Sequence, residues 1–375
     1  MSSGIRLSKA LVVTKCSRWL SLADSLGSSF GTSGSSAARV RSRVRSELRR
    51  RRYPAEKLEA SHERNEAVLL SLVKALEGAG ASVDVIYARD LRRRHVRDVD
   101  AIFTCGGDGT MLATSRYIVS KTVPVIGVNS DPVLSAGELC SVSASKEGDS
   151  FSKMARVVEA IQSGRFATLY RSRIRTSIYK DDFHGDPCAT HFEGVESPAS
   201  FALNEVFVSE RDPARPAILE MGGFTDDGDE IGPVILRSSG CIVATGTGSS
   251  AWISNAAMVH PRDVQAVTGN KDIAACARIA ERIDRKWRME ASSDLVQYYI
   301  REPIIFTGSS KYMSQPRTPF SAHRGFASHI TLSPLGFDAQ VNVDGIHSMG
   351  ADYGSRIKLQ IDPEFSLRCL RFPGI

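Results

Sequence analysis

One short turn, Gly106-Gly107-Asp108-Gly109-Thr110, constrains the fold of this chain more than any other stretch. It follows the apolar run 101–105 and precedes the helix-favouring run 111–115. This order predicts a buried strand, a tight glycine turn and the start of a helix. The bare N–H groups of the turn and the helix dipole behind it favour a bound polyphosphate. Asp108 is unexpected there, since phosphate repels a carboxylate unless the carboxylate binds a metal or takes a proton. The alternative is an ordinary tight turn in which Asp108 caps the next helix.

The segments around the turn alternate between strand and helix patterns. Residues 10–14, 83–87 and 124–128 are apolar runs of strand length, and 64–75 carry apolar side chains at helical spacing. Such alternation predicts a Rossmann-like parallel α/β domain. The glycine turn then lies at the carboxyl end of a strand, where open α/β sheets bind ligands.

The pattern changes after about residue 150. Short, often alternating apolar segments follow, separated by turn residues such as 226–229. They predict a second, β-rich sandwich domain over 149–375, interrupted by a helical insertion at 255–298. The α/β domain would then cover 53–148. Residues 1–52 would form a basic Ser/Gly/Arg-rich region that includes the first strand.

Charge and cysteine content exclude several classes of protein. The chain has 375 residues and a net charge of +6. Residues 1–52 alone carry twelve Lys/Arg against two acids, so the remainder has a net charge of −4. A nucleic-acid face spread over the fold is therefore not expected. The seven cysteines form no CxxC pair, which argues against a zinc ribbon and fits a reducing compartment. No apolar run approaches the roughly 20 residues that a membrane span needs.

The basic N-terminus allows two interpretations. Residues 1–46 are rich in Ser and Arg with few acids, as organelle transit peptides are. A strand at 10–14, however, leaves only a very short removable leader. We therefore expect the arginines of 39–52 to lie in a solvated segment, with a helix face or a targeting remnant as alternatives. The Gly/Ser-rich stretch 25–38 is expected to be mobile.

A second motif is Asn204-Glu205, between the apolar runs 201–203 and 206–208. A carboxamide and a carboxylate between two strand segments are costly if buried without partners. An Asn side chain can form paired hydrogen bonds with a base edge, and a Glu can accept from ribose hydroxyls. The alternative is an ordinary bulge or turn at a strand end.

A third motif is the loop 245–252, Thr-Gly-Thr-Gly-Ser-Ser-Ala-Trp, which follows the apolar run 241–244. Its hydroxyls and glycines suit a second anion or sugar cradle. Trp252 suits stacking on a planar ring, although a core tryptophan in a Gly/Ser loop is the alternative. The fourth motif, 341–345 (Val-Asn-Val-Asp-Gly), alone predicts only a strand and a turn.

Together, in this order and across two domains, the four motifs resemble those of the NAD kinase family over residues 10–362. The resemblance is strongest to the mitochondrial-type branch, with some likeness to plant-type NADH kinases. It rests further on 127–132 (Gly-Val-Asn-Ser-Asp-Pro), 238–240 and 301–303. The chain departs from the commoner bacterial pattern at 136–139, which lacks an aromatic residue, and at Ser239, Gly246 and Trp252. These departures concern the adenine contact and the nicotinamide end.

The resemblance implies transfer of the γ-phosphoryl group of ATP, with Mg²⁺, to the 2′-hydroxyl of the adenosine ribose of NAD or NADH. Asp108 would be the general base that takes the hydroxyl proton. Asn204 would bind adenine, and Glu205 the ribose hydroxyls. No protein ligand to a metal is implied. The implied ligand-binding residues are Gly106, Gly107, Gly109, Thr110, Asn129, Asn204, Glu205, Thr245, Thr247, Gly248, Ser249, Ser250, Ala251, Trp252 and Asn255.

The resemblance also implies a homodimer or higher homo-oligomer, with no nucleic-acid partner and no membrane span. Together with the basic N-terminus it favours a mitochondrial location, and a cytoplasmic one is the alternative. The choice between NAD and NADH, and between ATP and inorganic polyphosphate, stays open.

Two other functions compete with this one. Lipid kinases of the diacylglycerol or sphingosine type share the glycine turn, but they carry a second glycine loop about thirty residues downstream. Residues 136–147 contain no such loop. A non-catalytic dinucleotide sensor with the same fold is the other alternative, and the intact Asp108 argues against it.

Overall fold

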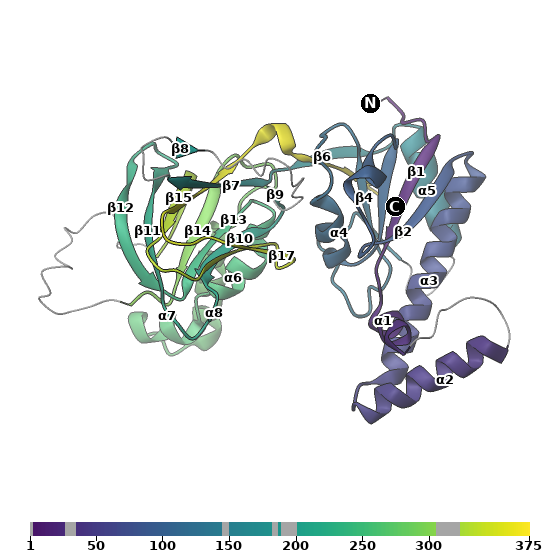
Figure 1. Cartoon of the computed structure of the whole chain (residues 1–375), viewed down its shortest axis with the longest axis horizontal. Coiled ribbons are helices and arrows are strands. Elements are labelled where there is room, and N and C mark those ends of the chain that lie inside the picture. The colour runs from purple at the N-terminus through teal and green to yellow at the C-terminus, as the bar shows by residue number, and fades with distance from the viewer. Residues whose placement is uncertain (1–2, 27–34, 145–149, 182–186, 189–200, 305–322) are drawn as a thin grey trace, which may run out of the picture. The chain divides into compact units, whose positions relative to one another are not determined.

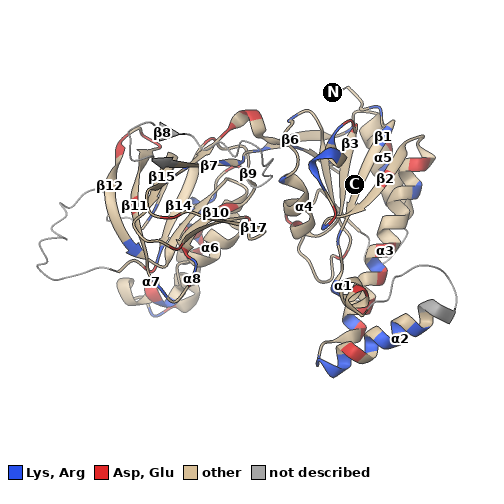
Figure 2. Ribbon diagram, viewed as in Figure 1, with Lys and Arg blue, Asp and Glu red and all other residues tan. Residues whose placement is uncertain are grey.

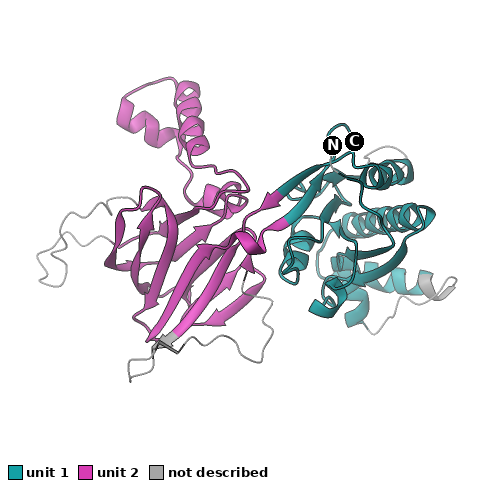
Figure 3. Cartoon of the chain, turned by 90° about the horizontal axis from the view of Figure 1, so that it is seen from above, with its two compact units in different colours: residues 1–169, 368–375 teal, residues 170–367 magenta. Residues whose placement is uncertain are grey.

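The computed structural model describes residues 3–26, 35–144, 150–181, 187–188, 201–304 and 323–375. The chain divides into two compact units, unit 1 with residues 1–169 and 368–375 and unit 2 with residues 170–367 (Figure 3). The expected boundary at 148–149 therefore falls inside unit 1. The reason is that helix α5 (Ser150–Gln162) packs against α3 (Ala55–Gly78), and the last strand returns to the sheet of unit 1.

Unit 1 is a parallel α/β domain (Figure 1), which confirms the predicted Rossmann-like arrangement. The strand order of its sheet is β2-β1-β3-β4-β19-β6, with β5 beside β4. The β1–β2, β1–β3 and β3–β4 pairs are parallel. The strands are β1 (Lys9–Thr14), β2 (Ser82–Tyr87), β3 (Ala101–Gly106), β4 (Val125–Asn129), β5 (Val142–Ser143), β6 (Ala167–Arg171) and β19 (Leu367–Arg371).

The central strands of this sheet are buried along their whole length, which is typical of parallel strands covered on both faces. Every residue of β3 and of β4 is buried. Helix α3 contributes Val68, Leu72 and Leu76 to the same core, each four residues from the next and so on one face. Helix α5 adds Met154 and Val157. The predicted helix at 64–75 is thus part of the longer α3.

The basic N-terminal segment forms a helix whose arginines are mostly exposed, which agrees with the helix-face alternative rather than with a solvated loop. Helix α2 (Ser35–Arg50) buries Val44 and Leu48 in a cluster that includes Trp19 of α1 (Arg18–Ser25). Arginines on α2 pair with glutamates on α3, in the pairs Arg41–Glu63, Arg45–Glu59 and Arg49–Glu56. Figure 2 shows the basic residues along α2. Because exposed ion pairs contribute little, the apolar contacts hold this helix. Most of the stretch 25–38 lies outside the described residues.

Unit 2 is β-rich, as predicted, and its strands belong to one connected sheet of mainly antiparallel pairs. The strand order is β17-β16-β10-β13-β14-β15-β18-β7-β8, with β11 joining β15 to β12 and β9 pairing with β7. The strands are β7 (Ile174–Asp181), β8 (Pro187–Cys188), β9 (Phe201–Ala202), β10 (Glu205–Glu210), β11 (Ala217–Thr225), β12 (Glu230–Ser238), β13 (Gly240–Ala244), β14 (Val296–Arg301), β15 (Arg324–Pro334), β16 (Ala339–Val343), β17 (His347–Gly350) and β18 (Ser355–Ile361).

The helical insertion lies between β13 and β14. It contains α6 (Trp252–Ala256), α7 (Pro261–Thr268) and α8 (Ile273–Lys286). Helices α7 and α8 pack through a small cluster around Val264, Cys276 and Ala280. The insertion ends before Val296, so residues 296–298, which the sequence placed in it, are strand. Among the described residues, no helix is both long and apolar enough to cross a bilayer.

Candidate functional site

The glycine turn of unit 1 has the predicted geometry, and Asp108 takes a role that differs from a helix cap. Helix α4 (Asp108–Ser115) follows β3 directly, with Gly107 as its extended N-cap residue. The Asp108 side chain reaches across to a neighbouring loop. Its Oδ1 accepts a hydrogen bond from the N–H of Leu139 at 2.8 Å, and its Oδ2 accepts one from Glu138 at 3.1 Å.

These two hydrogen bonds fix the orientation of the Asp108 carboxylate. Each carboxylate oxygen has two lone pairs, so each can still accept a hydrogen bond from a ligand. Sequence reasoning missed the role of residues 138–139 because any residue type except proline supplies a backbone N–H. The loop that lacks the family's aromatic residue therefore positions Asp108 through its main chain.

The three glycines of the turn have different surroundings. A Cβ on Gly106 would lie 2.2 Å from Oγ1 of Thr110, and one on Gly107 would lie 2.6 Å from Oγ of Ser135. These two glycines are required by close packing within the protein. A Cβ on Gly109 would meet nothing within 4 Å. Gly109 thus leaves open space beside Asp108, where a ligand can approach the backbone.

Asn129 ends the neighbouring strand β4 and is fully buried. Its amide nitrogen donates to the carbonyl of Ser135 at 2.9 Å, and its Oδ1 accepts from the N–H of Asp131 at 3.1 Å. The side chain therefore shapes the loop that follows β4. The structure brings Asn129 close to the glycine turn, since β3 and β4 pair between Gly106 and Asn129.

In unit 2, strand register brings three of the motifs to one end of the sheet. Glu205 at the start of β10 pairs with Ala244 at the end of β13, and Val206 pairs with Val343 at the end of β16. Asn204-Glu205, the loop after Ala244 and the turn after Val343 are consequently neighbours. The sequence placed the first two in the site but gave the third no role.

Asp344 holds the Asn204-Glu205 segment in place. It has a positive φ of 50°, and its carboxylate accepts hydrogen bonds from the N–H groups of Leu203 (2.8 Å), Asn204 (2.8 Å) and Glu205 (3.1 Å). Burial raises the pKa of Asp344 above its ordinary value, although the three N–H donors oppose that shift. The Asp-Gly dipeptide after an apolar strand was the only signal in the sequence.

The side chains of Asn204 and Glu205 have unsatisfied buried atoms. Among the described residues, no hydrogen-bond partner is found for Oδ1 of Asn204 or Oε2 of Glu205. Burial, and secondarily the charge of Asp344, raises the pKa of Glu205 to about 7. Native proteins rarely leave such groups unpaired, so these two acceptors are available to a polar ligand.

The hydroxyls of the 245–250 loop are largely used within the protein. Thr245 donates to the carbonyl of Leu203 at 2.6 Å and accepts from the N–H of Gly248 at 3.0 Å. Ser249 donates to the carbonyl of Gly246 at 2.7 Å and accepts from the N–H of Met289 at 2.9 Å. The Ser250 hydroxyl donates to the Thr247 carbonyl, and the Thr247 hydroxyl accepts from the Arg171 guanidinium. The loop is therefore a rigid, self-bonded turn.

Trp252 is neither a core residue nor fully exposed. Its side chain is 38% exposed, and its ring contacts Phe207 edge-on with centroids 5.0 Å apart. The Arg301 guanidinium lies 5.6 Å from the Trp252 ring centroid. Glu302 accepts a hydrogen bond from Ser239 and pairs with Arg301. Two departures from the bacterial pattern, Ser239 and Trp252, thus belong to one connected group.

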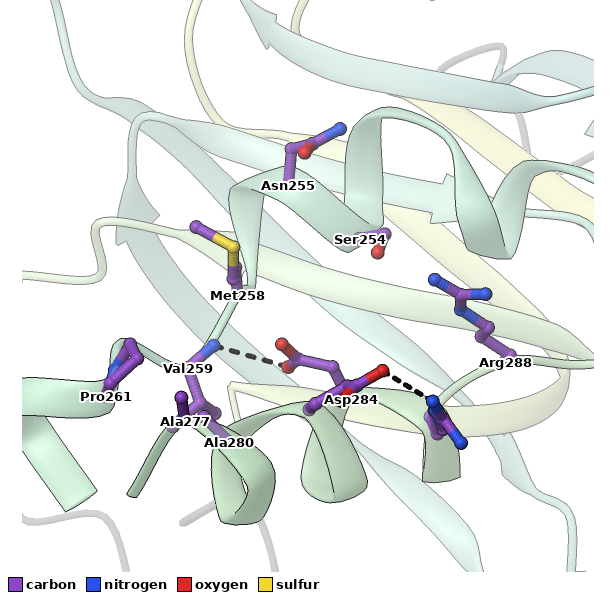
Figure 4. Close-up of a pocket in the computed structure, with 11 residues that line it drawn as sticks. Ser254, Asn255, Met258, Val259, Pro261, Ala277, Ala280, Asp284 and Arg288 are labelled. Atoms are coloured by element: carbon purple, nitrogen blue, oxygen red, sulfur yellow. Dashed lines mark hydrogen bonds and ion pairs between the residues drawn. The ribbon is translucent and has the colours of Figure 1, made fainter. Parts of the chain in front are cut away.

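Ala251 and Asn255 follow this loop, at the start of α6 and within it. The Asn255 amide donates to the carbonyl of Ala251 at 3.1 Å. Asn255 also lines a pocket of about 700 Å³ between α6 and α8 (Figure 4). The pocket's Asp284 accepts from the N–H of Val259, and its Arg285 pairs with Glu281. No group of three or more His, Cys, Asp or Glu side chains suited to a metal occurs within the described part of the chain.

The chain thus combines a parallel α/β unit that carries the glycine–aspartate turn with a β-rich unit of antiparallel strand pairs. Residues 12–145 match the family model of the ATP-NAD kinase N-terminal domain. The chain therefore carries an NAD kinase domain over these residues.

Individual relatives agree with this assignment. "NAD kinase 2, mitochondrial" from Rattus norvegicus is 28% identical over 327 residues, covering 79% of this chain and 73% of that protein. "Probable NADH kinase" from Oryza sativa subsp. japonica is 25% identical and covers 71% of this chain and 70% of that one. The structure of an NAD kinase from Archaeoglobus fulgidus in complex with ATP shares the fold, with a TM-score of 0.52 at 16% identity. It covers 97% of this chain and 94% of that one.

Proposed function

We propose that this protein phosphorylates the 2′-hydroxyl of the adenosine ribose of NAD or NADH, with ATP as the donor and Asp108 as the general base. The family and the named relatives support ATP-dependent phosphorylation of NAD. The finer assignments of hydroxyl and base rest on the residues themselves. Mg²⁺ would enter with the ATP phosphates and neutralise part of their charge.

The geometry of Asp108 is the observation that carries this proposal. A ribose hydroxyl must lose its proton as it attacks phosphorus, and a positioned carboxylate can take it. Asp108 is held by the N–H groups of Glu138 and Leu139, and it borders the open space at Gly109. It is thus oriented before any substrate arrives, which is what proximity catalysis requires.

Binding of the nucleoside would fall to unit 2. The unpaired acceptor of Asn204 suits the exocyclic amine of adenine, and the carboxylate of Glu205 suits a pair of ribose hydroxyls. A hydroxyl pair is a good match for Glu205, because hydrogen bonds from the ligand favour the charged carboxylate that burial disfavours. Thr245, Gly248 and Ser249 would act by keeping the neighbouring loop rigid.

Product formation tests the proposal directly. The purified chain is mixed with ATP and Mg²⁺ and with either NAD or NADH, and the phosphorylated dinucleotide is quantified with a dehydrogenase that accepts only the 2′-phosphorylated form. Product from at least one acceptor is expected. Replacing ATP with inorganic polyphosphate tests the donor. Binding of NAD without any product from either acceptor would instead indicate a non-catalytic sensor.

We further propose a mitochondrial location and a homo-oligomeric state. Similarity to relatives named mitochondrial supports the location. Cell fractionation of the tagged full-length chain and light scattering of the purified protein test these two statements. Recovery in the cytosol, or a monomer mass, would contradict them.

A further inference from the structure

Arg171 is a buried cation for which the described part of the protein provides no opposite charge. It ends strand β6, is only 7% exposed, and donates one hydrogen bond, from Nη1 to Oγ1 of Thr247 at 3.2 Å. Its Nε is buried, and no described residue provides it with a hydrogen-bond partner. Among the described residues, no carboxylate forms an ion pair with it.

The two arginines that follow at alternate positions differ from Arg171 in this respect. Arg173 donates to the carbonyl oxygen of Phe365, and its charge acts on the buried Asp344. Arg175 forms an ion pair with Asp362 at 3.3 Å. Both have acceptors within unit 2. Within the described part of the chain, the Arg171 guanidinium has a neutral hydroxyl, that of Thr247, as its one hydrogen-bond acceptor.

The energetics make this arrangement unfavourable without a ligand. A guanidinium cannot lose its proton in a protein, so Arg171 keeps its charge. Burying a charge without a counter-ion costs several kcal/mol even after relaxation. A binding site accounts for such a group, because a bound anion removes the penalty and gains charge-assisted hydrogen bonds.

The guanidinium of Arg171 lies beside the 245–249 loop, and its shape favours a phosphate group as the anion. Its hydrogen-bond partner Thr247 lies in the middle of the rigid loop 245–249. Ser172 donates to the carbonyl of Ala291 at 2.8 Å, and a Cβ on Gly246 would lie only 1.8 Å from the Glu290 carbonyl oxygen. The guanidinium is therefore fixed beside this loop. Its planar donors match the oxygens of a phosphate group.

We infer that Arg171 is the counter-ion of a nucleotide phosphate bound at the 245–249 loop. This inference rests on the proposed function, which supplies two phosphate-bearing ligands. The pyrophosphate of the dinucleotide and the triphosphate of ATP share the chemistry, and the arms of the experiment distinguish them.

The experiment uses the full chain with Arg171→Gln, Arg171→Lys and the control Arg175→Gln. Thermal unfolding is followed without ligand and with NAD, ATP or inorganic pyrophosphate, and Kd values come from calorimetry. We expect Arg171→Gln to unfold at the wild-type temperature or above, because it removes an uncompensated charge. Its affinity for one nucleotide should fall about 10- to 100-fold, the effect of losing hydrogen bonds to a charged group. Arg171→Lys should lose less, and Arg175→Gln should bind as the wild type does.

The arms of this experiment have distinct outcomes. Weaker binding of NAD alone assigns Arg171 to the dinucleotide, and weaker binding of ATP alone assigns it to the donor. Unchanged affinities for NAD, ATP and pyrophosphate in both variants would overturn the inference. So would an Arg171→Gln protein that unfolds at a lower temperature or fails to fold, because the charge would then be structural. Failure of the wild-type enzyme to form NADP(H) would contradict the proposed function. The change in unfolding temperature with inorganic pyrophosphate, compared between the wild type and the Arg171 variants, would still test the role of Arg171.

Discussion

The two units of the molecule present their carboxylates in opposite ways. In unit 1, both oxygens of Asp108 accept hydrogen bonds from backbone N–H groups, so the carboxylate is satisfied and oriented. In unit 2, Oε2 of Glu205 and Oδ1 of the neighbouring Asn204 are buried, and neither has a hydrogen-bond partner among the residues that the structure describes. Asp344 satisfies the backbone of this pair but leaves the side chains free.

This difference distinguishes a group that reacts with a ligand from groups that recognise a ligand. A general base must be held in one orientation, because misplacement of reacting groups costs rate. A recognition group instead keeps its hydrogen-bonding capacity for the ligand and incurs a stability cost when the ligand is absent. The same contrast holds between Arg171 and its paired neighbours.

The largest expected effect on stability comes from Glu205. Its pKa is raised from 4.5 to about 7 in the folded chain, so the folded state holds a proton that the unfolded state releases. The free energy of unfolding should therefore fall by about 3 kcal/mol as the pH rises from about 4.5 to above 7. Denaturant unfolding at several pH values measures this. Glu205→Gln should remove the fall, and the exposed Glu230→Gln should not. An identical pH profile for Glu205→Gln would mean that Glu205 is not desolvated.

Gly248 offers a test of the rigid loop in unit 2. A Cβ there would lie 2.0 Å from the carbonyl oxygen of Asn204, so Gly248→Ala must displace the loop or Asn204. We expect a loss of about 1–3 kcal/mol in unfolding free energy and weaker NAD binding. Gly350→Ala, where nothing lies within 4 Å, is the control for both measurements. If Gly248→Ala kept the wild-type stability and NAD affinity, the loop would not be rigid, because it could move aside without a loss of free energy.

Gly109 in unit 1 should behave in the opposite way, with the smallest effect on stability. A Cβ meets nothing within 4 Å, and alanine is the better helix former, so Gly109→Ala should stabilise the fold by up to about 1 kcal/mol. Turnover should nevertheless fall, because the methyl group occupies the space beside Asp108. Calorimetric unfolding and steady-state kinetics on the same preparation check both parts. Full activity would mean that no ligand approaches the backbone at this glycine.

Much of the fold was predictable because the signals were local. Strands 101–105 and 124–128 and the helix at 64–75 carry strong apolar patterns, and strand–helix alternation determines a parallel sheet. The basic helix α2 was not predictable in the same way. Its two buried residues, Val44 and Leu48, lie among ten arginines and serines, and their contact with Trp19 depends on tertiary packing.

The sequence predicted which residue types form the site but not which groups they contact. Asp108, Asn204 and Glu205 stand out because polar groups between apolar strands are costly. The N–H groups of Glu138 and Leu139 could not be identified, since they belong to the main chain. Asp344 and Arg171 each lie far along the chain from the groups they contact. Strand register brings Asp344 to the Asn204-Glu205 segment, and Arg171 contacts Thr247 through its side chain.

The central claim is that Asp108 takes the proton of the attacking hydroxyl. The most direct measurement is the turnover number of Asp108→Asn for NADP(H) formation, compared with Asp100→Asn. Asp100 also accepts two backbone hydrogen bonds, from Ser8 at 2.6 Å and Lys9 at 2.8 Å, and it directly precedes strand β3, at the end opposite to Asp108. Both variants thus remove the charge of a carboxylate that accepts backbone hydrogen bonds.

We predict that Asp108→Asn lowers turnover by a factor of about 10² to 10⁴, the usual cost of losing a general base, while Asp100→Asn stays near the wild-type value. Near-normal turnover in Asp108→Asn, or an equal loss in both variants, would contradict the assignment of Asp108 as the base.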